Sequence, residues 1–271
     1  MSTKISARFA HTKISVGYCQ ICGEHKKLTA DHVPPKGSIT LSVVEQKTVI
    51  EHTGNEDVKG VKGKRGSVFK TICQKCNSDL GLFDSEIKRV NELLIGKIRG
   101  FYTFANSPYN YVSEILNVKL YLRGIIGHML ASTSVSSCLS PLPITDFYQP
   151  LRDFVQGGIA SIDNTHDIFY WFYPNRFNIS GKGFAIAELG KGEPTICAAL
   201  YFYPVAVLVC SKGHICPQLS NRHRLNSNSS KLIVDLSSNL FKQSGFPFYS
   251  LEGTTMLALR DSDVTVSYPI K

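Results

Sequence analysis

Apolar side chains recur every three or four residues in two stretches of the chain, which is the spacing of one buried helix face. In the first stretch they are Phe83, Ile87, Val90, Leu94 and Ile98, and in the second Val118, Leu122, Ile125, Ile126 and Met129. We therefore predict helices over residues 83–100 and 118–131. Asp84 or Ser85 could cap the first of these helices, and a shorter helix is expected over 150–157.

Beyond residue 160 the pattern changes to short runs rich in β-branched and aromatic residues, separated by clusters of Gly, Asn, Ser and Asp. Such runs predict strands, which we expect to pair mainly antiparallel. The runs cover residues 167–173, 184–189, 195–210, 232–236, 254–259 and 264–268. Nearer the N-terminus, residues 18–28 indicate a short hairpin, and residues 39–51 allow a strand or a hairpin. The predicted fold class is α+β.

The composition is typical of a folded, soluble protein. Of the 271 residues 43% are hydrophobic, but no apolar run is long enough to span a bilayer and the first residues lack the apolar segment of a secretory signal. We therefore expect a cytoplasmic protein without a membrane partner. Basic residues number 30 against 21 acidic ones, and residues 1–100 hold 17 basic and 10 acidic side chains. This excess favours a polyanionic partner, although solubility alone would also explain it.

Four of the eight cysteines form two CxxC pairs, namely Cys19, Cys22, Cys73 and Cys76. In a chain without a secretion signal such pairs indicate metal ligands rather than disulfides. Two pairs can supply the four thiolates of a tetrahedral zinc site, with zinc–sulfur bonds of about 2.3 Å. A structural zinc ion is therefore predicted, and a redox pair or free thiols are the alternatives.

The residues near these cysteines extend the pattern to CxxC, DH and CxxCN. Asp31 and His32 lie between the two pairs, and Asn77 directly follows Cys76. This arrangement resembles the HNH nuclease superfamily, also called the ββα-metal or His-Me finger nucleases. The segment LTADHVPPK at residues 28–36 is similar to the HNH strand and loop, and CxxCN is similar to the start of the helix in phage junction-resolving endonucleases. The resemblance covers about residues 18–100.

The resemblance implies a zinc-stapled ββα-metal module that hydrolyses phosphodiester bonds in DNA. His32 would be the catalytic general base, since an imidazole ordinarily has a pKa near 6.5. Asp31 and Asn77 would hold the catalytic Mg²⁺ or Mn²⁺, which prefer oxygen ligands. On the residues alone, the Asp-His pair could instead be a turn with an exposed histidine, and Asn77 could be the N-cap of the helix. Asp79 is a further candidate ligand or simply a first-turn acid.

The sequence departs from the HNH pattern in two places. Residues 65–72 contain no middle Asn or His to orient the base, so Thr71 or a backbone carbonyl would have to orient His32. The segment between Asp31 and Cys73 is also longer than usual. It carries four basic residues that we interpret as phosphate contacts, Lys59, Lys62, Lys64 and Arg65, although a solvated flexible loop is the alternative.

We predict three parts: a basic N-terminal arm at 1–17, an HNH nuclease module at 18–101, and a separate α+β domain at 102–271. The last would recognise the target, sense a signal or mediate dimerisation. A single HNH site cuts one strand, so a homodimer would explain double-strand cleavage. Two-part chains of this kind resemble bacterial restriction or phage-defence nucleases. The alternatives are a non-catalytic zinc-stapled nucleic-acid-binding protein, and a nuclease gated by a small molecule on the C-terminal domain.

Overall fold

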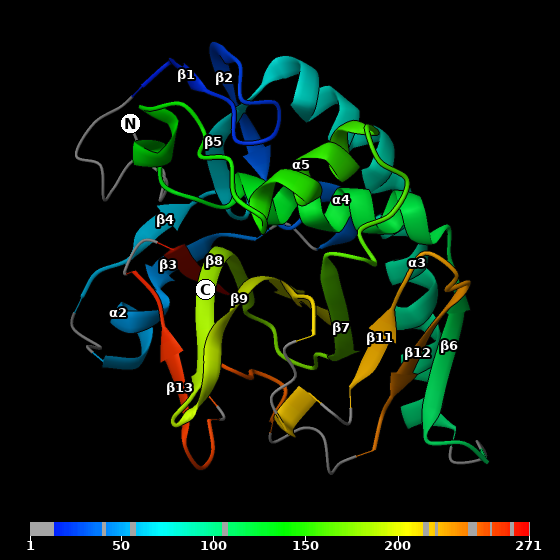
Figure 1. The fold of residues 1–271 in the computed structure, drawn as a ribbon. Helices are drawn as coiled ribbons and strands as arrows, with labels where there is room; N and C mark the ends of the chain where they lie inside the picture. The colour runs from blue at the N-terminus through cyan, green and yellow to red at the C-terminus, as the bar shows by residue number, and fades with distance from the viewer. Residues whose placement is uncertain are drawn as a thin grey trace.

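The computed structural model describes residues 14–39, 42–54, 58–104, 108–213, 217–219, 222–237, 243–249, 251–260 and 263–270. Most of the expected N-terminal arm, residues 1–13, lies outside these ranges. The fold is mixed α+β with antiparallel sheets, as predicted from the sequence (Figure 1). No helix within the described ranges combines the length and the apolar character needed to cross a membrane.

The N-terminal part is a small sheet followed by a long helix. Strands β1 (Val16–Tyr18), β2 (His25–His32) and β5 (Val68–Cys73) form a three-stranded antiparallel sheet in the order β1-β2-β5. Helix α3 (Gln74–Thr103) begins directly after β5. The prediction that Asp84 or Ser85 caps this helix is therefore wrong, because its first two turns bury only Cys76 and Leu80 and show no long apolar pattern.

The largest sheet contains nine strands, drawn from both ends of the chain. Its main order is β11-β7-β10-β9-β8-β14-β3-β4, with β13 pairing separately with β8. The strands are β3 (Val44–Thr48), β4 (Val61–Gly63), β7 (His166–Phe172), β8 (Asn178–Glu188), β9 (Lys191–Phe202), β10 (Val205–Ser211), β11 (His223–Leu225), β13 (Thr255–Ala258) and β14 (Val264–Pro269). The run at 195–210, expected as one strand, is a hairpin of two, because a turn containing Pro204 interrupts it.

Both faces of this sheet are covered, which explains why β7 and β10 are apolar along almost their whole length. Helices α4 (Val118–Ala131) and α5 (Tyr148–Gln156) cover one face, and α3 lies beside α4 (Figure 1). At Gly124 and Gly127 of α4 a side chain would collide with Ile87 and Leu80 of α3, so glycine lets the two helices approach closely.

Short elements complete the described structure. Strands β6 (Tyr111–Ile115) and β12 (Lys231–Asp235) form a two-stranded sheet beside α3. Helix α2 (Val49–Gly54) follows β3 directly. The 3-10 turns are η1 (Lys36–Ser38), η2 (Val135–Cys138) and η3 (Pro217–Leu219).

The expected nuclease segment and the expected C-terminal domain share a sheet. Strand β3 pairs along its length with β14, and the hydroxyl of Ser67 lies 2.6 Å from that of Ser267. The segment that carries the four predicted phosphate contacts includes strand β4, and residues 55–57 lie outside the described ranges. The boundary near residue 102 remains a prediction, but the two sides of it pack against one another.

His166, at the start of β7, gives this fold a specific acid sensitivity. Only 2% of the residue is exposed, its Nε2 lies 3.0 Å from the carbonyl oxygen of Phe147, and burial lowers its pKa to about 4. The unfolded chain takes up this proton near pH 6.5, so the free energy of unfolding should fall as the pH drops below that value. We expect a loss of about 2 kcal/mol between pH 7.5 and pH 5.

Urea unfolding of the natural chain and of His166→Gln at both pH values measures this contribution. The variant should lose about 2 kcal/mol less than the natural chain over the same interval. An equal loss in both proteins would show that His166 does not carry the effect.

Candidate metal centre and nuclease site

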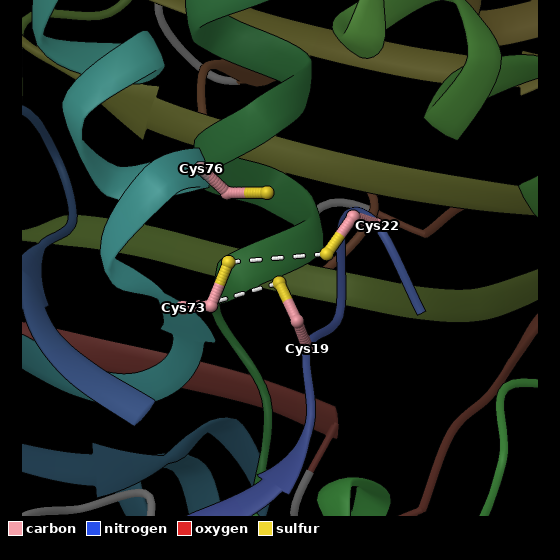
Figure 2. Close-up of side chains that lie close together, drawn as sticks. All are labelled: Cys19, Cys22, Cys73 and Cys76. Carbon is pink, nitrogen blue, oxygen red and sulfur yellow. Dashed lines mark hydrogen bonds between the residues drawn. The ribbon is translucent and has the colours of Figure 1, made fainter. Parts of the chain in front are cut away.

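The two CxxC pairs meet at the point where the small sheet joins α3. Cys19 and Cys22 belong to the turn between β1 and β2, Cys73 ends β5, and Cys76 lies in the first turn of α3. The four sulfur atoms lie within 4.8 Å of one another, and Figure 2 shows them turned toward a common space. Gly23, with a φ of 75°, provides the left-handed residue that closes the turn after Cys22.

The dimensions of this cluster suit a metal ion. In a tetrahedral site with zinc–sulfur bonds of about 2.3 Å, neighbouring sulfurs would lie about 3.8 Å apart. The Sγ atoms of Cys22 and Cys73 are separated by 3.8 Å, and the backbone N–H of Cys73 donates to the Cys19 sulfur at 3.3 Å. The four cysteines can therefore bind a metal ion, and their arrangement is compatible with structural zinc.

The pKa values of Cys19, Cys22 and Cys76 also favour a bound cation. A hydrogen bond from the Cys76 thiol lowers the pKa of Cys19 to about 5, with backbone N–H groups contributing. Burial raises the pKa of Cys22 to about 12, and the contact with Cys19 raises the pKa of Cys76. Without a cation, the charge on Cys19 therefore keeps its neighbours protonated. A divalent ion among the four sulfurs would stabilise all of them as thiolates.

Asp31 and His32 lie at the end of β2, where the pairing with β5 becomes irregular between Thr29 and Asp31. Asp31 is buried, with 7% of the residue exposed, whereas His32 is half-buried. The carboxylate Oδ2 of Asp31 lies 3.0 Å from Nδ1 of His128 in α4. This contact involves one carboxylate oxygen and leaves Oδ1 with no protein partner in the described structure.

Asn77 connects α3 to β2 immediately before these two residues. Its side-chain amide donates to the Thr29 hydroxyl and to the Ala30 carbonyl, both at 3.0 Å. The N-cap of α3 is Cys73, so the alternative that Asn77 caps the helix is wrong. With the amide nitrogen engaged, the Asn77 oxygen has no hydrogen bond to any described residue.

His128 is the residue of this region that the sequence pattern did not mark as functional. It is fully buried, and its Nε2 lies 2.8 Å from Oδ1 of Asp84, so the ring bridges Asp31 and Asp84. Burial alone would lower its pKa, but the charge of Asp31 and the hydrogen bonds to both carboxylates raise it to about 10. At neutral pH the ring is therefore an imidazolium that donates to Asp31 from one side and to Asp84 from the other.

Thr71 and Asp79, for which the sequence also suggested roles at this site, have other partners in the structure. The hydroxyl of Thr71 donates to the Ala131 carbonyl at 2.5 Å, so its proton is not available to orient His32. Asp79 forms an ion pair with Lys75 at 2.7 Å one turn earlier on the helix surface.

The four predicted phosphate contacts lie in and around β4. Lys59, Lys62, Lys64 and Arg65 are all exposed, and β4 is the last strand on its side of the large sheet. An exposed basic edge of this kind can contact a polyanion without rearrangement of the core.

Comparison with known proteins gives no relative for this chain. No family model matches it, and neither does any curated protein or solved structure.

Proposed function

We propose that the protein is a divalent-metal-dependent endonuclease that hydrolyses phosphodiester bonds in DNA, with a structural zinc ion at its four cysteines. The observation that carries this proposal is the connection between α3 and β2. The Asn77 amide binds the β2 backbone at Ala30, and Asp31 and His32 follow directly in the chain. Strand β2 pairs with β5, and α3 follows β5 directly with Cys73 and Cys76 at its start, which agrees with the ββα-metal arrangement that the sequence resembles.

The side chains support separate roles in this reaction. Asp31 and Asn77 each have an oxygen without a protein partner in the described structure, which suits a Mg²⁺ or Mn²⁺ ion that keeps several waters. Such an ion, when bound, would stabilise charge on the phosphate and on the leaving oxygen. His128 holds the Asp31 carboxylate in one orientation, as a partner behind a metal ligand does. His32 would accept the proton of the attacking water.

A nucleic acid is a polyanion of the kind that this charge distribution favours. Lys59, Lys62, Lys64 and Arg65 add positive charge at the edge of the large sheet, and they would contact phosphates rather than read bases. The preference for DNA over RNA follows the HNH resemblance, so the test below includes both.

Incubation of the full chain with supercoiled plasmid, single-stranded DNA and RNA in Mg²⁺ or Mn²⁺ tests the proposal. We expect nicking of DNA that requires the added metal. His32→Ala should reduce the rate by about 10²–10⁴-fold, the usual contribution of a general base. His25→Ala is the matched control, because His25 lies on the same strand and is exposed. Equal cleavage by the His32 variant and the control would contradict the role of His32.

A second candidate function is a non-catalytic zinc-stapled nucleic-acid-binding protein. The buried ion pair of Asp31 with His128 favours it, because a structural role would account for the position of Asp31 without any catalytic metal. Binding of DNA with no cleavage in either metal would support this second function. The same experiment tests the other two expectations. If a homodimer cleaves both strands, double-strand cleavage should depend on protein concentration. If a small molecule gates the nuclease, cleavage should depend on added cell extract.

A further inference from the structure

A cavity of about 580 Å³ lies between the loop after β2 and the turn after β7. Ser38 and Ile39 come from the first segment, Asn175 and Arg176 from the second, and Ile95 of α3 and Tyr203 also line it. Its volume falls within the range of about 300–1,000 Å³ typical of small-molecule sites. The cavity thus lies between the expected nuclease segment and the C-terminal sheet.

The cavity continues along α3 into a second hollow. This hollow has a volume of about 470 Å³ and shares Ile95, Pro174 and Tyr203 with the first. It is also lined by Arg99 and Tyr102 of α3. The two hollows therefore adjoin and form one groove, which we call the α3 groove.

The charge of the α3 groove is positive. Arg99 and Arg176 are both exposed, and neither forms an ion pair with any described residue. The described residues that line the groove include no aspartate or glutamate. Two unpaired guanidinium groups suit an anionic ligand, and phosphate in particular, because a guanidinium can donate two hydrogen bonds to it.

The remaining lining is suited to a ring. Tyr203 is half-buried where the two hollows adjoin, and Tyr102 is 56% exposed on α3. Aromatic side chains of this kind can stack on a nucleobase. The Ser38 hydroxyl is buried and has no hydrogen-bond partner among the described residues, so this wall also contains an unsatisfied polar group.

We propose that the α3 groove binds a nucleotide, with its phosphate at Arg176 and its base against Tyr203. The nucleotide can come from two sources, a free nucleotide or one residue of a single-stranded nucleic acid. This proposal depends only on the residues of the α3 groove, and it would hold even if the protein does not cleave DNA. If cleavage is also shown, the groove is well placed to affect it, because Ser38 follows His32 by six residues and η1 packs on α3.

Binding to the full chain without added Mg²⁺ or Mn²⁺ tests this proposal independently of catalysis. The probes are adenosine, guanosine, cytidine and uridine monophosphates, inorganic phosphate, and a single-stranded DNA of about 12 nucleotides. The variants are Arg176→Gln and Tyr203→Leu, and Lys231→Gln is the control for removal of an exposed positive charge outside the groove. Unfolding of each variant is measured in parallel, and Arg176→Gln decides if Tyr203→Leu does not fold.

Saturable binding of a monophosphate that weakens at least about tenfold in Arg176→Gln, and not in Lys231→Gln, would support a free nucleotide. If Arg176→Gln weakens binding of the oligonucleotide but not of the monophosphates, the result would support binding of one nucleotide of a single-stranded nucleic acid. Binding of inorganic phosphate as tight as that of the monophosphates would overturn the role of the base. Affinities for every probe that are equal in the natural chain and Arg176→Gln would overturn the proposal, as would the absence of binding.

Discussion

Replacing Cys19 and Cys22 together by serine should remove the bound zinc and lower the melting temperature by roughly 10–20 °C. These two cysteines hold the turn between β1 and β2 against the start of α3, and Cys19 is fully buried. Structural zinc contributes about 10–16 kcal/mol in small zinc-binding peptides. Here part of the fold is also stabilised by the apolar core, so we expect a loss of at least about 5 kcal/mol.

Zinc content of the purified protein and thermal unfolding measure the two effects. Cys197→Ala is the matched control, since Cys197 is also fully buried but lies in β9, outside the cluster of four. The control should keep one zinc ion per chain and melt within a few degrees of the natural protein. A double serine variant that melts like the control and contains no zinc would show that the fold does not need the metal.

Replacing His128 by leucine should lower the free energy of unfolding by about 3–5 kcal/mol. The imidazolium is the only positive group recorded within ion-pair distance of Asp31 or Asp84 in the described structure. Leucine has a similar volume but cannot donate, so the Asp31 carboxylate would remain buried without a counter-charge. Removal of one partner from a buried ion pair typically costs this much.

Chemical unfolding at pH 7 measures the loss, and charge removal at the carboxylates controls for packing. A triple variant with His128→Leu, Asp31→Asn and Asp84→Asn should recover a large part of the stability, because no unpaired charge remains. If His128→Leu unfolds within 1 kcal/mol of the natural chain, the ion pairs contribute little. If the triple variant is less stable than His128→Leu, the loss comes from packing rather than from charge.

Local patterns in the sequence were sufficient for the elements that bury one continuous face. Helix α4 spans the predicted residues 118–131, and the aromatic run at 169–173 is buried as a core strand should be. The start of α3 was missed because its first turns expose Gln74, Lys75 and Ser78, so no apolar repeat marks them. The strands β6 and β11 were also missed, since each is short and partly polar.

Local patterns likewise predict one part of the candidate site and not another. The spacing of the cysteines is enough to predict that they form one cluster, because each CxxC pair forms a local turn and only four thiols are needed. The contact of His128 with Asp31 joins residues 97 positions apart, and no local pattern encodes it. The only local signal was a histidine in the middle of an apolar helix face, and in the structure His128 is buried and bonded to two carboxylates.

Because β3 pairs with β14, we do not expect residues 1–101 to fold as an independent unit. If residues 1–101 were excised and fused to another protein, β3 would lose its partner β14. The backbone N–H and C=O groups that now bond to β14 would then be exposed to solvent. Such an open edge invites self-association. Strand β14 thus completes a sheet begun more than 200 residues earlier, so the first half can finish folding only after β14 has been synthesised.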